Sequence, residues 1–293
     1  MTSRVPLTSP LQPFAKDARP RAARRQDRAR APRSRAGTAQ DRQFVTALAR
    51  GLEVLRVFKP GDVWLGNQDL AERTGLPKPT VSRLTYTLTQ LGYLLYSEEL
   101  GKYRLGAGVL ALGYAMLAGM DIRERARPLM QRLADEVNAA VSLGTRDRLN
   151  MVYLETCRGP GALTLRLDVG SRIPIGTTAM GRALLAALPD SERDYLLSHL
   201  RKHHGRDFAP ILKGVETAVR DVKTRGFCFS VGDWQRDVHA VGAPLVAPDG
   251  SAVFALNCGG PSFLLTREKL ETEIGPRLAE LARHLCAMAA PAP

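Results

Sequence analysis

The chain has 293 residues and a formal net charge of +13, with 44% hydrophobic and 24% charged residues. This length and composition predict one or two globular domains with a buried core and exclude a largely disordered chain. The four cysteines have no short spacing between any two, which argues against a zinc ribbon or a disulfide framework and fits a reducing compartment. The longest nearly uncharged run, residues 105–120, is too short to span a membrane. Without a signal-peptide segment, we expect a cytoplasmic protein that has no membrane partner.

Residues 1–43 are predicted to form a disordered basic arm. They hold eleven Lys and Arg against three Asp, a net charge of +8, while the remaining 250 residues carry +5. An Arg-, Ala- and Pro-rich segment without aliphatic periodicity does not form a packed core. Such an arm increases non-specific attraction to phosphates. A dispensable tail from a misassigned start codon is an equal alternative, and a transit peptide ranks third.

The first folded segment, 44–58, has the pattern of an amphipathic helix that ends at Pro60-Gly61. Its expected inner face is Val45, Leu48, Leu52 and Leu55. A second helix is predicted to start at Asn67 as its N-cap, and to end at Gly75 in the left-handed C′ conformation.

A third helix follows at once, within the stretch LPKPTVSRLTYTLTQLGYL (76–94). The expected apolar stripe is Val81, Leu84, Leu88 and Leu91, and the opposite face carries no acidic residue. Residues 93–105 then read as two short strands around a turn at Glu99-Leu100-Gly101. Three helices and a basic hairpin make up a winged helix-turn-helix.

The polar face of the third helix and the hairpin predict a DNA interface. In this fold the helix N-terminus meets base edges in the major groove, while cations and N–H groups hold phosphates. Arg83 is suited to bidentate pairing with guanine. The expected DNA-contacting residues are Lys78, Pro79, Thr80, Ser82, Arg83, Tyr86, Lys102 and Arg104. The alternatives are that the prolines only mark a helix N-terminus, and that the small domain binds protein.

Residues 106–120 are apolar on nearly every side, so a helix there has to be covered by its own chain or by a second copy. A further helix is expected to be capped by Asp121, with the stripe Ile122, Ala126, Leu129, Leu133 and Val137. Downstream, the predicted strands are 141–155 (two strands with a turn at Asp147-Arg148), 162–169, 226–230, 239–247 and 252–258, the last two joined by Pro248-Asp249-Gly250. The predicted helices are 175–188, starting at Thr177 or Thr178, 190–200, 211–225 and 266–289. This order indicates an α+β domain with a mostly antiparallel sheet.

Over about residues 44–290 the sequence resembles the IclR family of bacterial transcription regulators. The resemblance is carried by LAERTGLPKPTVSRLTYTLTQLGYL, GKYRLGAGVLALG, DIRERARPLMQRLADEVNAAVSLG, VGSRIPIGTTAMGRALLA and GAPLVAPDGSAVFALNCGGP. It implies a winged helix-turn-helix over 44–105, a dimerising linker helix over 106–120, and a GAF-like domain over 121–290 that senses a small molecule. It also implies a homodimer or a dimer of dimers that represses or activates a catabolic operon through a palindromic operator.

The same resemblance implies an effector pocket with departures from the family pattern. Family members that hold small acids present an acidic residue, a Cys or Ser, and two Ser at positions that match Ser230, Ala240, Asn257 and Gly259. The helix that begins near Thr177 also offers an anion site at its positive end, through the N–H groups of Thr178, Ala179, Met180 and Gly181. We therefore expect a small organic acid, aromatic or otherwise bulky. The alternative is that small residues there only allow close helix–sheet packing.

Other groups of residues give weaker evidence for a function. No motif places a His beside Cys157 or Cys228, and no Gly-rich phosphate loop occurs, so we expect neither an enzyme nor a cofactor. His199, His203 and His204 have a spacing that can hold a metal, but cationic neighbours argue against it. His239 is either a pocket donor or a structural hydrogen-bond partner. A nucleoid-like, non-specific DNA-binding protein without ligand response is the alternative function.

Overall fold

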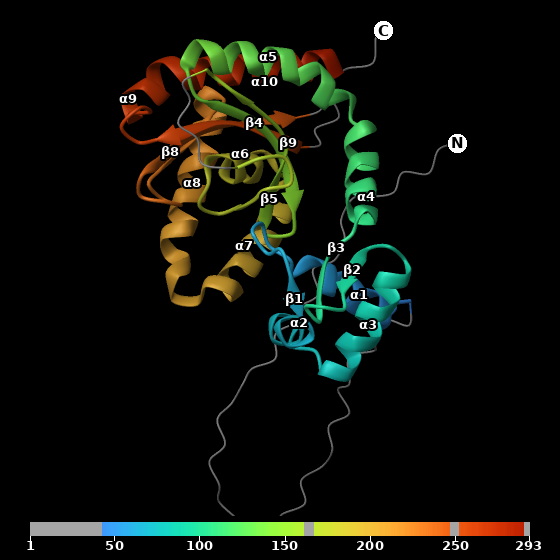
Figure 1. Cartoon of the computed structure of the whole chain (residues 1–293). Helices are drawn as coiled ribbons and strands as arrows, with labels where there is room; N and C mark the ends of the chain where they lie inside the picture. The colour runs from blue at the N-terminus through green and yellow to red at the C-terminus, as the bar shows by residue number, and fades with distance from the viewer. Residues whose placement is uncertain (1–42, 161–166, 247–251, 290–293) are drawn as a thin grey trace, which may run out of the picture. The chain divides into compact units, whose positions relative to one another are not determined.

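The computed structural model describes residues 43–160, 167–246 and 252–289 (Figure 1). The chain divides into two compact units, with the boundary between residues 108 and 109. The expected basic arm, most of the expected strand over 162–169 and the expected turn at 248–250 lie outside the described residues. The two units are described separately below.

The N-terminal unit is the predicted winged helix-turn-helix. Its elements are α1 (Thr46–Arg56), β1 (Leu65–Gly66), α2 (Asn67–Thr74), α3 (Lys78–Gln90), β2 (Leu94–Ser97) and β3 (Lys102–Leu105). The strands form an antiparallel sheet in the order β1-β3-β2. A small core joins helices and sheet, made of Val54, Leu65, Leu70, Val81, Leu88 and Leu94. Gly75 ends α2 with φ 67°, as predicted.

The expected inner face of α1 is wrong. Val45, Leu48 and Leu52 are exposed, and Gly51 and Val54 are the buried residues of this helix. The reason is the contact between α1 and α3. Gly51 has no side chain, and a Cβ built on it would lie 3.9 Å from the Leu84 Cδ2 atom of α3. The sequence period identified a helix, but it did not identify which apolar face packs.

Two helix ends also differ from the prediction. The N-cap of α2 is Gly66 rather than Asn67, and the Asp69 carboxylate accepts a hydrogen bond of 2.8 Å from the Gly66 N–H. In α3, Leu91 is not part of the apolar stripe, because it lies at the C-terminal cap and is exposed. Thr85 is buried in the helix instead, with its hydroxyl donating to the Val81 carbonyl.

The linker region forms α4 (Ala107–Ala118), which has no buried residue although it lacks charged side chains. It is followed by α5 (Asp121–Val137). Asp121 is the first helical residue, not the N-cap, which is Met120. The buried side of α5 consists of Ala126, Met130, Leu133, Ala134 and Val137, so Met130 and Ala134 replace the expected Ile122 and Leu129, which are only partly buried. No helix of the described residues is long and apolar enough to cross a membrane.

The second unit is built on a six-stranded antiparallel sheet, which confirms the α+β prediction. Its strands are β4 (Ala140–Asp147), β5 (Asn150–Arg158), β6 (Arg172–Pro174), β7 (Cys228–Val231), β8 (Val238–Val246) and β9 (Ala252–Pro261). Their order in the sheet is β6-β5-β4-β9-β8-β7. One face packs against α5 and α10 (Gly275–Ala289), and the other against α6 (Ala179–Ala187) and α8 (Phe208–Arg225), with α7 (Asp190–His204) beside α8 (Figure 1).

One helix was expected over 266–289, but the C-terminal segment is not a single regular α-helix. It begins with α9 (Arg267–Lys269), passes through a π-helical turn over Leu270–Ile274, and continues as α10. Leu270 and Ile274 are both fully buried in this turn. Gly275 follows, where a Cβ would overlap the ring of Phe227. The glycine thus lets the helix pass close over an aromatic side chain of the core.

Glycines at the start of α6 serve close packing. A Cβ at Gly181 would overlap the backbone of Ile175, and a Cβ at Gly176 would lie 2.7 Å from the Cγ2 atom of Ile211. The packing alternative therefore holds for these two positions. Gly113 in α4 has nothing within 4 Å of the position of a Cβ.

These contacts predict opposite effects of two Gly→Ala substitutions. Gly181→Ala should lower the free energy of unfolding of the second unit by about 1–3 kcal/mol, because backbone has to move to admit the methyl group. Gly113→Ala should be neutral or raise it by up to about 1 kcal/mol through helix propensity. Urea unfolding followed by circular dichroism measures both. Equal stability of the two variants would contradict the close contact at Gly181.

Candidate functional site

The outer face of α3 carries most of the residues predicted to contact DNA. Lys78, Pro79, Ser82, Arg83 and Tyr86 are exposed, while Thr80 is half-buried. The first turn of the helix contains no acidic residue. Among the described residues, neither Lys78 nor Arg83 has an ion-pair partner within 4 Å. Two free cations thus lie near the positive end of a helix, an arrangement that favours an anionic partner.

Residues at the start of α2 support this face. The Asn67 side chain donates a hydrogen bond of 3.0 Å to the Ser82 hydroxyl, which leaves the Ser82 proton for another acceptor. Arg73, by contrast, is engaged with Asp62 and with the Val57 carbonyl. The hydrogen bond between the Arg73 and Asp62 side chains lowers the pKa of Asp62 and raises the pKa of Arg73. Arg73 therefore holds the loop after α1 and is not a free cation.

The wing between β2 and β3 presents two cations in different states. Lys102 is exposed and has no ion-pair partner among the described residues. The Arg104 guanidinium lies 5.1 Å from the ring centroid of Trp64, in a cation–π contact. Trp64 was missed in the sequence, since it lies before β1 in a segment without periodicity. It restricts the orientation of Arg104, which remains exposed.

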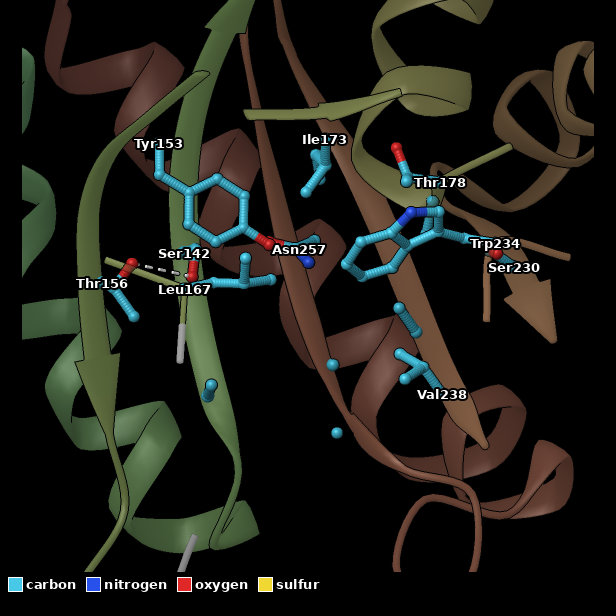
Figure 2. A pocket seen from close by; sticks show the side chains of 15 residues that line it. Ser142, Tyr153, Thr156, Leu167, Ile173, Thr178, Ser230, Trp234, Val238 and Asn257 are labelled. Atoms are coloured by element: carbon cyan, nitrogen blue, oxygen red, sulfur yellow. Dashed lines mark hydrogen bonds between the residues drawn. The ribbon is translucent and has the colours of Figure 1, made fainter. Parts of the chain in front are cut away.

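The second unit contains a pocket between the sheet and the N-terminus of α6 (Figure 2). The cavity measures about 40 Å³. Its lining consists of Ala140, Ser142, Tyr153, Thr156, Leu167, Ile173, Thr178, Ala179, Ser230, Trp234, Val238, Ala240, Asn257, Gly259 and Gly260. Six of the eight residues expected at the effector site are among them. No Lys, Arg, His, Asp or Glu of the described residues lines this pocket.

Met180 and Gly181, two of the residues expected to offer N–H groups to an anion, are not among the lining residues of the pocket. The Met180 side chain is fully buried and packs against Gly144, where a Cβ would overlap the Met180 sulfur. The Gly181 N–H, expected to be free for an anion, is bonded to the Thr178 hydroxyl at 3.3 Å. Only the first amide groups of α6, those of Ala179 and Met180, remain for a ligand.

Thr178 and Ser230 are already bonded to backbone. Thr178 is the N-cap of α6, as predicted, and its hydroxyl donates to the Pro174 carbonyl at 2.7 Å. The Ser230 hydroxyl donates to the Thr177 carbonyl at 2.7 Å. Both oxygens retain acceptor capacity only. These contacts position the start of α6 against β7.

The space beside Gly259 is narrower than expected. A Cβ there would lie 3.2 Å from the Ala240 Cβ and 3.6 Å from the Asn257 amide nitrogen. The small residues at 240 and 259 therefore leave space for the Asn257 side chain beside them on the sheet. They do not leave a large opening.

Several lining residues were missed in the sequence, and strand pairing explains most of them. Ser142 pairs with Asn257, and Ala140 pairs with Gly259, in the β4–β9 register. On β5, Tyr153 and Thr156 face the same side only because a bulge falls between them, where Glu155 pairs with Leu143 and Tyr153 with Gly144. A period of two would have placed Tyr153 on the opposite face.

Trp234 gave no sequence signal, since it lies in the loop between β7 and β8. Figure 2 shows its indole reaching into the pocket between Thr178 and Val238. The loop is tied to α6 by the neighbouring Asp233, whose carboxylate accepts a hydrogen bond of 2.7 Å from Arg182. Arg182 is itself buried and also donates to the Phe229 carbonyl at 3.1 Å.

The remaining candidates are explained by local contacts. His239 donates from Nδ1 to the Leu265 carbonyl at 2.9 Å and does not line the pocket, so it is a structural partner. His199 bonds the Tyr195 carbonyl at 2.8 Å within α7, and the described residues contain no group of three or more metal-binding side chains. Burial raises the pKa of the Cys228 thiol to about 12, so this thiol is not a nucleophile at neutral pH.

A winged helix-turn-helix with unpaired cations, followed by an α+β unit with an internal pocket, defines a two-domain transcriptional regulator. Family comparison agrees: residues 47–98 match the IclR helix-turn-helix domain, and residues 114–287 match the bacterial transcriptional regulator IclR C-terminal domain. The chain belongs to the IclR family of bacterial transcriptional regulators. Members of this family are regulators, not enzymes.

Individual relatives extend over most of the chain. It is 36% identical over 244 residues to the HTH-type transcriptional regulator TsaQ1/TsaQ2 of Comamonas testosteroni, covering 83% of this chain and 87% of that protein. A crystal structure of an IclR family transcriptional regulator from Brucella abortus is 52% identical, with a TM-score of 0.80, and covers 87% of this chain and 97% of that one. An IclR homolog from Microbacterium hydrocarbonoxydans, solved with 4-hydroxybenzoate, shares the fold at 22% identity and a TM-score of 0.63, covering 83% and 98%.

Proposed function

We propose that this protein is a ligand-responsive, sequence-specific regulator of a catabolic operon, and that the pocket at the start of α6 senses a small organic acid. The observation that carries the proposal is the pocket itself, a partly polar cavity at the N-terminus of a nine-residue helix, lined by no charged side chain of the described residues. Because no Lys, Arg or His of the described residues lines the pocket, the positive end of that helix supplies the positive potential that favours a single carboxylate.

The apolar part of the lining favours an aromatic ring. It is formed by Leu167, Ile173, Trp234, Val238 and Ala240. A cavity of about 40 Å³ holds only a few water molecules, and we propose that the Trp234 indole, which reaches into it, moves aside to admit a ring. The Microbacterium homolog, solved with 4-hydroxybenzoate, has the same fold with an aromatic acid as its ligand.

Ligand binding predicts a carboxylate-dependent stabilisation. Benzoate at a hundred times its dissociation constant should stabilise the protein by about 2.7 kcal/mol, whereas benzamide, which has no charge, should not. Thermal unfolding measures the stabilisation. Because Trp64 and Trp234 are the two tryptophans, fluorescence of the Trp64→Phe variant reports movement of Trp234 alone. Equal binding of acid and amide would contradict the anion site at α6.

The alternative is a nucleoid-like protein that binds DNA without sequence preference or ligand response. The two functions differ in whether an acid that stabilises the protein also changes its affinity for DNA. The pocket at the start of α6 favours the regulator, because non-specific binding needs only surface cations.

The DNA face predicts different roles for two cations. Arg83→Ala should reduce discrimination between the operator and random DNA by about 1–3 kcal/mol, because a bidentate base contact is lost. Lys102→Ala should weaken both complexes alike and lower the salt slope by about one unit. Fluorescence anisotropy against salt concentration measures both, with the exposed Arg206→Ala of the second unit as a control. Equal losses on both DNAs for Arg83→Ala would remove it from base readout.

Assembly is proposed from α4. Its exposed apolar side chains include Leu110, Leu112, Tyr114 and Met116, which are 75%, 60%, 68% and 51% exposed. A second copy covers such a helix in a two-fold dimer, and a palindromic operator would match that symmetry. Dimers of dimers remain equally compatible with these observations. A cytoplasmic location stays a prediction.

The dimer predicts a strong effect of charge on α4. Leu110→Glu should weaken self-association at least tenfold, since a buried leucine contributes about 1.5–3 kcal/mol. Phe263→Glu, at a position that is 71% exposed in the second unit, is the matched control and should leave association unchanged. Sedimentation equilibrium distinguishes the two. A wild-type protein that is monomeric at micromolar concentration would contradict the proposal.

A further inference from the structure

The second unit has another cleft, which is separate from the pocket at the start of α6. Its lining includes one face of α8, two residues of β7 and the first residue of α9. The cleft measures about 440 Å³, which is within the size range of small-molecule sites. It shares no lining residue with the pocket at the start of α6. Neither the DNA face nor the proposed acid site uses this cleft.

A buried guanidinium with a free donor group lines the cleft. Arg182 is 5% exposed, and its Nε and Nη1 atoms donate to the Gly176 carbonyl, the Phe229 carbonyl and the Asp233 carboxylate. Its Nη2 atom has no acceptor among the described residues. Gly214 of α8 makes room for this atom, because a Cβ there would overlap it. Buried donors are nearly always bonded, so Nη2 needs an acceptor from outside the described chain.

Two exposed cations line the same cleft. Lys213 has no carboxylate within 4 Å among the described residues. The Arg267 guanidinium lies 5.4 Å from the ring centroid of Phe229, and its contact with Glu271 is a distant one, 3.9 Å from Nε. Lys213 and the outer nitrogens of Arg267 are therefore available to an anion.

The two carboxylates of the lining do not cancel these charges. Asp233 is bonded to Arg182 at 2.7 Å, and Asp221 to Arg225 at 2.9 Å. Each carboxylate thus has an arginine of its own, and the two exposed cations remain unpaired. A ligand with a single charge would pair with one of them only, whereas a doubly charged ligand matches both.

The cleft also offers apolar surface. Pro210, Phe229 and Val231 contribute to its lining. Sites for organic ligands combine such surface with a few polar groups that fix the orientation of the ligand. A ligand with a carbon body therefore fits this cleft better than a bare inorganic ion.

We propose that this cleft is a second ligand site, which binds a small organic dianion, either a phosphate monoester or a dicarboxylate. The anionic groups bond Arg182 Nη2, Lys213 and Arg267, and the carbon body rests against Phe229. The site is independent of acid sensing at the start of α6.

Matched ligands test the charge requirement on the full-length protein. Calorimetry at about pH 8, where a phosphate monoester carries two charges, compares phenyl phosphate with benzenesulfonate and phthalate with benzoate. The members of each pair share the ring and differ by one charge. At equal ionic strength, at least one dianion should bind about tenfold or more tightly than its counterpart, because a hydrogen bond to a charged group contributes that order. The pair that shows the preference distinguishes a phosphate ligand from a dicarboxylate.

Variants locate the contact. Lys213→Ala and Arg267→Ala should each weaken binding of the preferred dianion about tenfold. Lys223→Ala is the matched control and should leave binding unchanged, because Lys223 lies on the same helix but does not line the cleft. All three side chains are exposed, so the variants are expected to fold, which circular dichroism checks. Benzoate affinity should be unchanged in every variant.

The outcomes separate this proposal from the proposed function. Dianions that bind no more tightly than their counterparts overturn the second site. Equal losses in Lys213→Ala and Lys223→Ala also overturn it, because the attraction then follows the overall charge. A preference that survives both cleft substitutions overturns it as well, since the dianion then binds elsewhere. Failure of benzoate to bind contradicts acid sensing alone and leaves the second site standing.

Discussion

Side chains on the central strands of the second unit alternate between two environments, and this alternation determines where a ligand can bind. On β4, Val141 and Leu143 join the hydrophobic core under α5 and α10, while Ala140 and Ser142 face the pocket. The same division holds on β9, where Leu256 and Cys258 are core residues. Antiparallel pairing keeps these sets in register, so that core and pocket are built from the same strands without competing for residues.

The bulge in β5 is the one interruption of this rule, and it has two consequences. It brings Tyr153 and Thr156 to the pocket face, although they are three residues apart. It also leaves Glu155 on the face of α5, where the buried carboxylate bonds Arg123 and Arg127, each at 2.9 Å. The first turns of α5 are thereby fixed to the strand that carries two pocket residues.

Sequence reasoning recovered the architecture because it depends on local signals: helix periodicity, turn residues and the small-residue start of α6. Ser230 and Asn257 were expected at the effector site from family motifs and Thr178 from the helix start, and all three line the pocket. It failed where tertiary contacts decide. The apolar residues of α1 have helical spacing on more than one face, and only the glycine at 51 shows which one packs.

Some pocket residues were misassigned or not expected from the sequence, for related reasons. Met180 and Gly181 belong to the right helix, but packing against Gly144 and Ile175 turns them away from the cavity. Tyr153 faces the cavity through a bulge that no local pattern marks, and Trp234 reaches it from a loop. A sequence shows the residues of a strand, but the partner strand and its register decide which of them meet.

The cations of α3 and of the wing differ in their ion pairing from several other arginines of the described residues. Buried Arg182 donates to the Gly176 and Phe229 carbonyls, and buried Glu155 forms ion pairs with Arg123 and Arg127, so both side chains serve the fold. Within the described residues, the cations of α3 and of the wing have no acidic partner within 4 Å. Cations without an acidic neighbour favour an anionic partner, as the phosphates of DNA are.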